Sequence, residues 1–153
     1  MERTLILLKP DAVQRGLVGT IIQRFEARGF KIVAAKLMQI TPELAAEHYA
    51  AHKGKGFYDA LVGFMTASPI MAMVLEGNDA VRVTRAMMGA TFGPNAESGT
   101  IRGDFGLSKQ YNLVHGSDSP ETAQREIALF FKRGEILPYD RPADAWVYAD
   151  EDR

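Results

Sequence analysis

Residues 4–11 read TLILLKPD, an apolar run that a proline interrupts. A short apolar run bounded by a turn signal predicts a buried strand. Because proline has no amide N–H to donate to a neighbouring strand, Pro10 should end this strand and leave Lys9 at its tip. The opening segment therefore predicts a strand that holds a basic side chain at one end.

Three later segments also have strand character. Residues 30–40 alternate well enough to predict a strand with one apolar face, which would carry Phe30, Ile32, Ala34, Met38 and Ile40. Ile70 to Leu75, after Pro69, predicts a third strand, and Asn112 to His115 a short fourth one. The chain therefore supplies four strands for one sheet.

Helices are expected between these strands. Apolar residues from Val18 to Phe25 recur at helical spacing, and Gly29 supplies a C-terminal stop. Residues 41–43 (TPE) and 119–121 (SPE) each combine a capping hydroxyl, a proline whose missing N–H costs nothing there, and an acid that suits the helix dipole. Each triplet predicts the start of a helix.

The middle of the chain mixes helical and irregular segments. A helix is expected over residues 57–64, and Asn78-Asp79 should cap another that Gly89 ends. From Gly89 to Tyr111, Gly, Asn, Ser and Thr are frequent and periodicity is weak, which predicts a long irregular loop. Such a loop in a compact domain is more often functional than idle.

The order of these elements reads as βαββαβ with inserted helices. It predicts an α+β fold in which helices cover a four-stranded antiparallel sheet, similar to a split βαβ motif. With 153 residues, no repeat and no linker, the chain fits one compact domain over residues 1–153.

Composition bounds the function classes. The formal net charge of -1 gives no bulk positive field, so nucleic acid is not expected as the main partner, and a polyanion must be held by a few converging basic residues. The absence of cysteine excludes disulfides and thiolate metal sites and suits a reducing cytoplasm. The apolar runs are too short for a signal core or a membrane span, so we expect a soluble cytoplasmic protein.

The common phosphate-binding loops are absent. Residues 54–56 (GKG) lack the upstream glycine and the hydroxyl of G-x-x-x-x-G-K-[ST], and no G-x-G-x-x-G occurs. If the protein handles nucleotides, side chains and helix ends must hold the phosphates.

Residues 112–118 read NLVHGSD and run into the helix start at Ser119. They place His115 at the end of a strand, just ahead of a helix N-terminus. An imidazole with the ordinary pKa of about 6.5 is largely neutral near neutral pH and can attack phosphorus. Considered alone, such a histidine more often only hydrogen-bonds at a strand end, and both interpretations stay open.

The same segment resembles the signature N-x-x-H-G-S-D of nucleoside diphosphate kinases, which Asn112, His115, Gly116, Ser117 and Asp118 match in full. Lys9-Pro10-Asp11 through Gly29-Phe30 is similar to the opening of that family, and residues 47–49 (EHY) and 99–105 (GTIRGDF) match further blocks. The resemblance extends in order over almost the whole chain, including the tail with Trp146. It implies a ferredoxin-like version of the α+β fold.

The resemblance also implies a ping-pong kinase. His115 would take the γ-phosphoryl group of a nucleoside triphosphate, mainly ATP, and give it to a nucleoside diphosphate. Mg²⁺ would be carried by the nucleotide phosphates, with no protein ligand assigned. A homo-oligomer is implied, with a hexamer favoured and a tetramer or dimer as alternatives.

Each expected site residue follows from its match to the family pattern. Ser117 and Glu126 match the residues that orient the histidine, and with Lys9 they are expected to act in catalysis. Asn112 and Lys9 match the residues that bind the ribose hydroxyls, and Phe57 matches the aromatic on which the base stacks. The phosphate-contacting positions are matched by Lys9, Tyr49, Arg85, Thr91 and Arg102.

Several of these residues have plainer interpretations. Phe57 could be a core aromatic, Arg85 could be an ordinary solvent-exposed residue on a helix, and Glu126 could be a surface acid. His48 and His52 stand four apart and could suggest a metal pair, but no H-E-x-x-H acid lies between them, so no zinc role is expected. Rival functions are a single-stranded nucleic-acid binding module and an oligomer without activity.

The chain departs from the family pattern in the expected loop. Phe92-Gly93-Pro94 stands where Asn-Pro is usual after Thr91, and Glu97-Ser98 stands where a proline commonly precedes the glycine. Lys109 occupies a region near the base where a smaller apolar residue is common. These departures leave the expected catalytic residues intact but put the loop conformation, the assembly and the base contacts in question.

Overall fold

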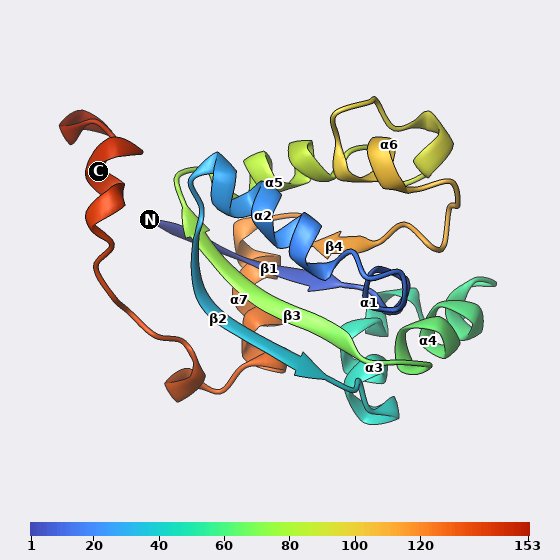
Figure 1. Ribbon diagram of the computed structural model, residues 1–153. Helices are drawn as coiled ribbons and strands as arrows, with labels where there is room; N and C mark the ends of the chain where they lie inside the picture. The colour runs from blue at the N-terminus through green and yellow to red at the C-terminus, as the bar shows by residue number, and fades with distance from the viewer.

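A computed structural model describes residues 1–153 and contains one four-stranded sheet (Figure 1). The strands lie in the order β2-β3-β1-β4, and all three pairs of neighbours are antiparallel. Their bounds are β1 Glu2–Leu8, β2 Lys31–Met38, β3 Ile70–Gly77 and β4 Val114–Gly116. The strand with which the chain begins therefore lies inside the sheet, between β3 and β4.

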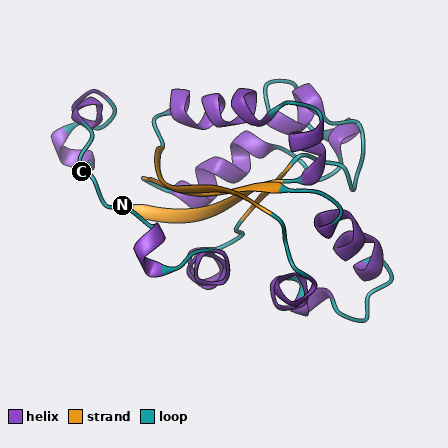
Figure 2. Ribbon diagram, turned by 60° about the horizontal axis from the view of Figure 1, so that its bottom comes forward, coloured by secondary structure: helices purple, strands orange, loops and turns teal.

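Helices cover both faces of this sheet (Figure 2). On one face lie α1 Pro10–Gln14, α2 Val18–Arg28, α5 Ala80–Met88 and α6 Ile101–Phe105. On the other lie α3 Pro42–His48, α4 Tyr58–Thr66 and α7 Pro120–Phe130. The α+β fold, with a four-stranded antiparallel sheet covered by helices, is confirmed.

The alternation of side chains along β1 fills two cores. Leu5 and Leu7 point into the core beneath α3 and α7, whereas Ile6 and Leu8 point into the core beneath α2 and α5. Because both faces are covered, the strand reads as a continuous apolar run. Directly opposite residues of an antiparallel pair share a face, and Leu7 pairs with His115. The His115 side chain therefore lies on the side of α3 and α7.

The prediction that residues 30–40 carry one apolar face is wrong. Phe30 and Ile32 pack in the α2 core, whereas Ala34, Met38 and Ile40 pack in the opposite core. The pairing register of β2 with β3 shifts between Ile32 and Ala34, so a bulge inserts an extra residue there. One inserted residue moves every later side chain to the other face.

Two short helices were not predicted from the sequence. The first, α1, begins at Pro10, which occupies the first helical position after Lys9. The second, α6, lies inside the segment 89–111 that was expected to be a loop, and the Thr100 hydroxyl caps it by accepting from the Gly103 amide at 3.0 Å. Helices this short present too few turns for apolar periodicity to reveal them.

The capping predictions hold at two helices and fail at a third. Thr41 and Ser119 accept hydrogen bonds from the amides of Leu44 and Thr122, each at 3.1 Å. Asp79 precedes α5 as expected but does not cap it. Instead, a carboxylate from the first strand, that of Glu2, accepts from the Val81 amide at 2.7 Å.

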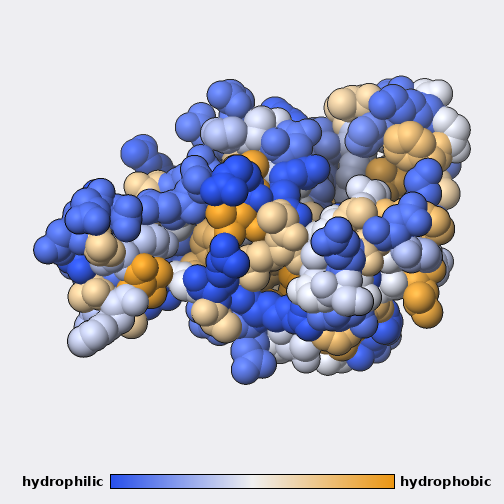
Figure 3. Space-filling view, turned by 90° about the horizontal axis from the view of Figure 1, so that it is seen from above, coloured by the Kyte–Doolittle hydropathy of each residue, from blue (hydrophilic) through white to orange (hydrophobic).

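The segment after α7 forms 3₁₀ turns at Arg133–Glu135, Pro142–Trp146 and Asp150–Asp152. It is attached to the sheet edge where the Leu137 amide donates to the Val33 carbonyl at 2.8 Å. Its end projects from the body as a lobe (Figure 3), on which Trp146 is 93% exposed. None of the helices combines the length and apolarity that crossing a bilayer would require.

We predict opposite effects of alanine at two helical glycines. In Gly103→Ala the added Cβ would lie 1.8 Å from the Glu97 carbonyl oxygen, so α6 must shift, and the free energy of unfolding should fall by more than about 2 kcal/mol. Gly63→Ala, where nothing lies within 4 Å, should raise it by about 0.5–1 kcal/mol. Urea denaturation of both variants measures the difference, and equal effects would contradict the close approach at Gly103.

Candidate active site

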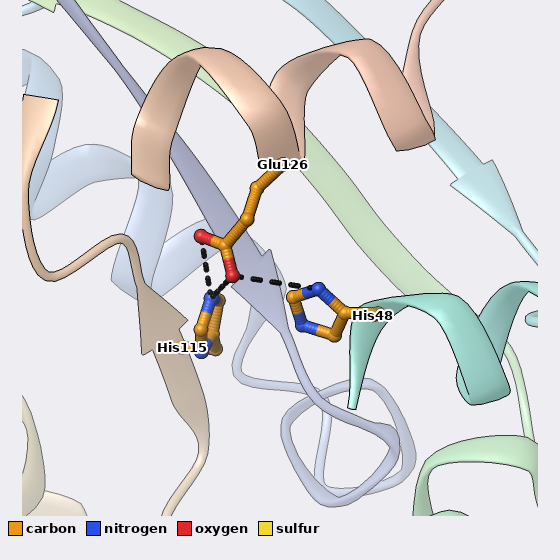
Figure 4. Close-up of side chains that lie close together, drawn as sticks. All are labelled: His48, His115 and Glu126. Carbon is orange, nitrogen blue, oxygen red and sulfur yellow. Dashed lines mark hydrogen bonds and ion pairs between the residues drawn. The ribbon is translucent and has the colours of Figure 1, made fainter. Parts of the chain in front are cut away.

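His115 forms the centre of a small hydrogen-bonded network on the α7 side of the sheet (Figure 4). Its Nε2 lies 3.1 and 3.2 Å from the two carboxylate oxygens of Glu126 on α7. Ser117, two residues further along the chain, donates its hydroxyl hydrogen to Glu126 Oε1 at 2.6 Å. Ser117 and Glu126, the two residues that were expected to orient His115, are therefore hydrogen-bonded to one another.

The charge of Glu126 fixes the tautomer of His115. Burial alone would raise the pKa of Glu126, but hydrogen bonds from His115 and Ser117 and the nearby imidazole outweigh it and hold the pKa at about 2. An ionised carboxylate has no hydrogen to donate, so the proton between the two groups belongs to Nε2. The Nδ1 atom of neutral His115 then keeps its lone pair.

A second histidine lies against this network. Sequence reasoning assigned it no role beyond a possible metal pair with His52 and a place in the matching block of residues 47–49. His48 lies on α3 with its ring centroid 5.0 Å from that of His115, and its Nδ1 is 3.4 Å from Glu126 Oε2. Burial, and then the neighbouring His115 imidazole, lower the pKa of His48 to about 3, so it is neutral. The signal for its position was the buried stripe of α3, on which it follows Ala45 by three residues.

Tyr49 packs beside His48, with ring centroids 4.5 Å apart. Its side chain is almost fully buried. Burial, and then the charge of Glu126, raise the pKa of the phenol above its usual value, so it keeps its proton. Tyr49 can therefore donate a hydrogen bond next to the histidine network.

Three cations lie near His115 without an acidic partner. The Lys9 ammonium donates to the Asn112 side-chain oxygen at 2.7 Å. The Arg102 guanidinium donates to three carbonyl oxygens, including that of Val114 at 2.6 Å, and Arg85 donates to the Gly116 carbonyl at 3.3 Å. Since Val114 and Gly116 flank the histidine in the chain, both guanidinium groups contact the backbone of β4 next to His115. None of the three forms an ion pair.

In this cationic cluster of Lys9, Arg85 and Arg102, Lys9 and Arg102 are buried, and the Asp11 carboxylate offsets the burial of Lys9 only in part. Burial, then the charge of Arg102, lower the pKa of Lys9 to about 8. Burial, then the charge of Arg85, lower the pKa of Arg102 to about 10, which leaves the guanidinium protonated at neutral pH. Buried charge without a counterion is unfavourable, and an anion that entered would relieve it. The cluster can therefore stabilise a bound anion.

The segment 89–111 joins the cationic cluster through Asn112. The side-chain amide of Asn112 donates to the Thr91 carbonyl at 2.9 Å. This hydrogen bond links the residues just before β4 to the segment 89–111. Gly93 begins a 3₁₀ turn, Gly93–Asn95, and a Cβ there would lie 2.6 Å from the Gly106 backbone. The departure at residues 92–94 thus has a packing reason, because only glycine fits so close to α6. Lys109 is exposed and forms no ion pair.

Phe57 lies apart from both networks, just before α4. It is 51% exposed, and its nearest aromatic neighbour is His52, with centroids 5.3 Å apart. The interpretation of Phe57 as a core aromatic is therefore wrong. The same is true of Glu126 as a surface acid, since that side chain is buried.

The backbone just before His115 is strained. Leu113 has a φ of 74°, a conformation that costs a residue with a side chain about 1 kcal/mol or more. The Asp11 carboxylate accepts from its amide at 3.1 Å, and the Lys9 amide donates to its carbonyl at 2.8 Å. This turn explains why β4 begins at Val114 rather than at the predicted Asn112.

Comparison with known proteins decides the family. A family model described as nucleoside diphosphate kinase matches residues 2–136. The chain belongs to the nucleoside diphosphate kinase family. It is similar to a nucleoside diphosphate kinase of Carboxydothermus hydrogenoformans, with 57% identity over 97% of this chain and 99% of that protein. The membership that the sequence predicted is confirmed.

Solved structures of this kinase family have the same fold. The halophilic nucleoside diphosphate kinase of Halobacterium salinarum, solved in complex with CDP, aligns with a TM-score of 0.94 and 53% identity, over 96% of this chain and 98% of that one. A nucleoside diphosphate kinase family protein of Babesia bovis also aligns with a TM-score of 0.94, at 44% identity, over 97% and 100% of the two chains. Both likenesses extend beyond the sheet to nearly the whole kinase chain.

We predict that removing the Lys9 charge stabilises the nucleotide-free kinase. The pKa of Lys9 falls from 10.5 to about 8 on folding, which at about 1.36 kcal/mol per unit disfavours the folded state by up to about 3 kcal/mol at neutral pH. After allowance for the lost hydrogen bond to Asn112, Lys9→Met should raise the free energy of unfolding by about 1–2 kcal/mol. Urea denaturation at pH 7 measures this.

Lys36 provides the matched control for this measurement. Its ammonium lies 3.1 Å from the Glu135 carboxylate and packs over the Phe131 ring. Lys36→Met should therefore leave stability unchanged or lower it slightly. A loss of stability in Lys9→Met would contradict an incompletely compensated charge at Lys9.

Proposed function

We propose that this chain is a nucleoside diphosphate kinase domain that transfers the γ-phosphoryl group of a nucleoside triphosphate, mainly ATP, to a nucleoside diphosphate through a phosphohistidine on His115. One observation carries the proposal. The Glu126 carboxylate holds the proton of His115 on Nε2, which leaves the Nδ1 lone pair available on a strand whose carbonyls on either side of His115 accept from Arg85 and Arg102. A free lone pair supplies the nucleophile, and the cations supply the phosphate site.

In the first half-reaction, Nδ1 forms a bond to the γ-phosphorus while the bond from that phosphorus to the β–γ bridging oxygen breaks. The nucleoside diphosphate leaves with the electron pair of that bond. Nε2 keeps its hydrogen, so the ring becomes a phosphorylated imidazolium whose positive charge the Glu126 carboxylate stabilises at 3.1 Å. The second half-reaction is the same step in reverse, with another diphosphate as acceptor.

The remaining roles rest on position and chemistry. Arg85 and Arg102, with the Tyr49 and Thr91 hydroxyls, would hold phosphate oxygens as charge moves toward the leaving group. Lys9 and Asn112, already hydrogen-bonded to one another, would bind the ribose hydroxyls, and Lys9 would also contact the phosphates. The exposed Phe57 ring would stack on the base, which accepts any base because each offers a π face.

The three converging side chains His48, His115 and Glu126 do not suit Mg²⁺. Two of them are imidazoles, whereas Mg²⁺ takes oxygen ligands in octahedral geometry. We therefore propose that Mg²⁺ binds through the nucleotide phosphates. There it would neutralise phosphate charge, which adds to what the cationic cluster supplies.

We also propose that the kinase works as a homo-oligomer in the cytoplasm. Trp146, Leu107 and Leu137 are 93%, 88% and 61% exposed, which is unfavourable for a monomer in water. A hexamer is favoured, with a tetramer or dimer as alternatives. A chain without cysteine suits the reducing cytoplasm.

We predict that His115 carries the phosphoryl group. Incubation with γ-labelled ATP should give label that is stable to base and labile to acid, as expected for phosphohistidine, and His115→Asn should abolish it without unfolding the protein. His52→Gln, which changes a histidine outside the hydrogen-bonded network, should label normally. Label on folded His115→Asn would remove the nucleophile assignment.

We predict that diphosphate affinity depends on the protonation of Lys9. The free enzyme loses that proton as the pH passes about 8, and a bound anion raises the pKa again, so affinity should be constant below pH 8. Above it, affinity should fall by up to about tenfold per pH unit. Titration of ADP between pH 6.5 and 9.5 measures the profile. Lys9→Arg should flatten it, and an unchanged profile in that variant would assign the titration to another group.

A further inference from the structure

Three potential metal ligands converge beneath the sheet from three different elements. His48 comes from α3, His115 from β4 and Glu126 from α7, and their donor atoms all lie within 4.8 Å of one another (Figure 4). The figure shows both rings turned toward the same carboxylate. His52, the histidine with which sequence reasoning paired His48, takes no part in this group.

The spacing of the donor atoms is close to that of a zinc site. Zinc binds imidazole nitrogen and carboxylate oxygen at about 2.0–2.2 Å in tetrahedral geometry, so its ligand atoms lie about 3.3–3.6 Å from one another. Glu126 Oε2 lies 3.1 Å from His115 Nε2 and 3.4 Å from His48 Nδ1. Both histidine nitrogens thus lie close to the spacing that zinc requires from a shared carboxylate oxygen, and rotation of the rings would bring the two nitrogens, which lie within 4.8 Å of one another, to coordination distance.

His48 supplies a further observation, because both of its ring nitrogens are buried and neither forms a hydrogen bond, although Nδ1 lies 3.4 Å from Glu126 Oε2. Its side chain is 1% exposed. A buried polar group without a partner costs about 1–3 kcal/mol, and its retention calls for an explanation. Phosphoryl transfer as described above gives His48 no task. A metal ion that accepted its lone pair would satisfy one of the two nitrogens.

We propose that His48, His115 and Glu126 form a zinc site that inhibits the kinase by selecting the wrong tautomer of His115. This inference rests on the proposed function of His115. Zinc takes the lone pair of Nε2, so the ring proton leaves Nε2 and Nδ1 becomes protonated. The ring has the same number of protons before and after, but Nδ1 has no lone pair left to form a bond to phosphorus. Zinc also occupies the Glu126 carboxylate that would stabilise the imidazolium.

The donor set favours zinc over the magnesium of the reaction. Imidazole nitrogen suits zinc, whereas magnesium prefers oxygen ligands throughout. The His115 side chain is 24% exposed, whereas those of His48 and Glu126 are 1% and 5% exposed, so His115 is the ligand that contacts solvent. Three protein ligands leave a fourth position open for water. The same histidine can therefore be inhibited by zinc at Nε2 while Mg²⁺ arrives with the nucleotide.

Direct binding tests the site without any turnover. Calorimetric titration of the nucleotide-free protein with Zn²⁺ alone should show one ion per chain. His48→Phe keeps an aromatic ring against Phe130, whose centroid is 5.1 Å away. It should weaken binding by more than about 100-fold, since even groups behind the ligands contribute about 10–100-fold. His52→Gln is the matched control and should bind as the wild type does. If His48→Phe does not fold, Glu126→Gln replaces it in the same titration.

Two further measurements test the mechanism of inhibition. Nitrogen-15 NMR of the histidine rings should place the His115 proton on Nε2 without zinc and on Nδ1 with zinc. The exchange rate in buffered free zinc, divided by the rate of the same variant without zinc, should fall at least tenfold in the wild type and in His52→Gln. In His48→Phe this ratio should stay near one.

The outcomes separate this proposal from the kinase mechanism. Equal zinc affinity in the wild type and in folded His48→Phe or Glu126→Gln would overturn the zinc site, even if His115 labels normally from ATP. Zinc binding without a change of the His115 tautomer would overturn the inhibition mechanism. If His115 fails to label while zinc binding still depends on His48, the kinase assignment is overturned and the zinc site remains supported.

Discussion

A carboxylate as buried as that of Glu126 would ordinarily take up a proton, yet hydrogen bonds from His115 and Ser117 keep it ionised. That constraint has a direct chemical result. Because the carboxylate can only accept, the histidine must donate from Nε2, and the lone pair of this proposed nucleophile stays on Nδ1. The same geometry places neutral His48 beside Glu126, where a metal ion bound to both residues could also bind Nε2 of His115. Reactivity and susceptibility to zinc thus have one origin.

Two members of the cationic cluster, Lys9 and Arg102, are also buried charged groups, but their charge is positive. Lys9 and Arg102 are largely removed from water and hydrogen-bond only to neutral oxygen atoms. Neither forms an ion pair, and the charge of Asp11 offsets the burial of Lys9 only in part, which lowers the stability of the free protein and leaves positive charge available to an anion. A carboxylate in this position would stabilise the fold and compete with the substrate. Stability and affinity for polyanions are therefore opposed at this site.

The fold joins the two networks through a three-residue strand. His115 points to the α7 side, where Glu126 lies, while the carbonyls of Val114 and Gly116 accept from the guanidinium groups of Arg102 and Arg85. The group that sets the tautomer thus comes from α7 on one face of the sheet, and the two guanidinium groups come from α5 and α6 on the other. The strained turn at Leu113 sets where that strand begins.

The sequence by itself determined the elements whose signals are local: the apolar run of β1, the capped helices after Thr41 and Ser119, and the family signature around His115. It could not reveal the bulge after Ile32, because a register shift depends on the partner strand. Nor could it pair His48 with Glu126, which lie 3.4 Å apart on two helices. Only the tertiary structure decides such contacts, since burial and charge depend on residues distant in the chain, and those determine which nitrogen holds a proton.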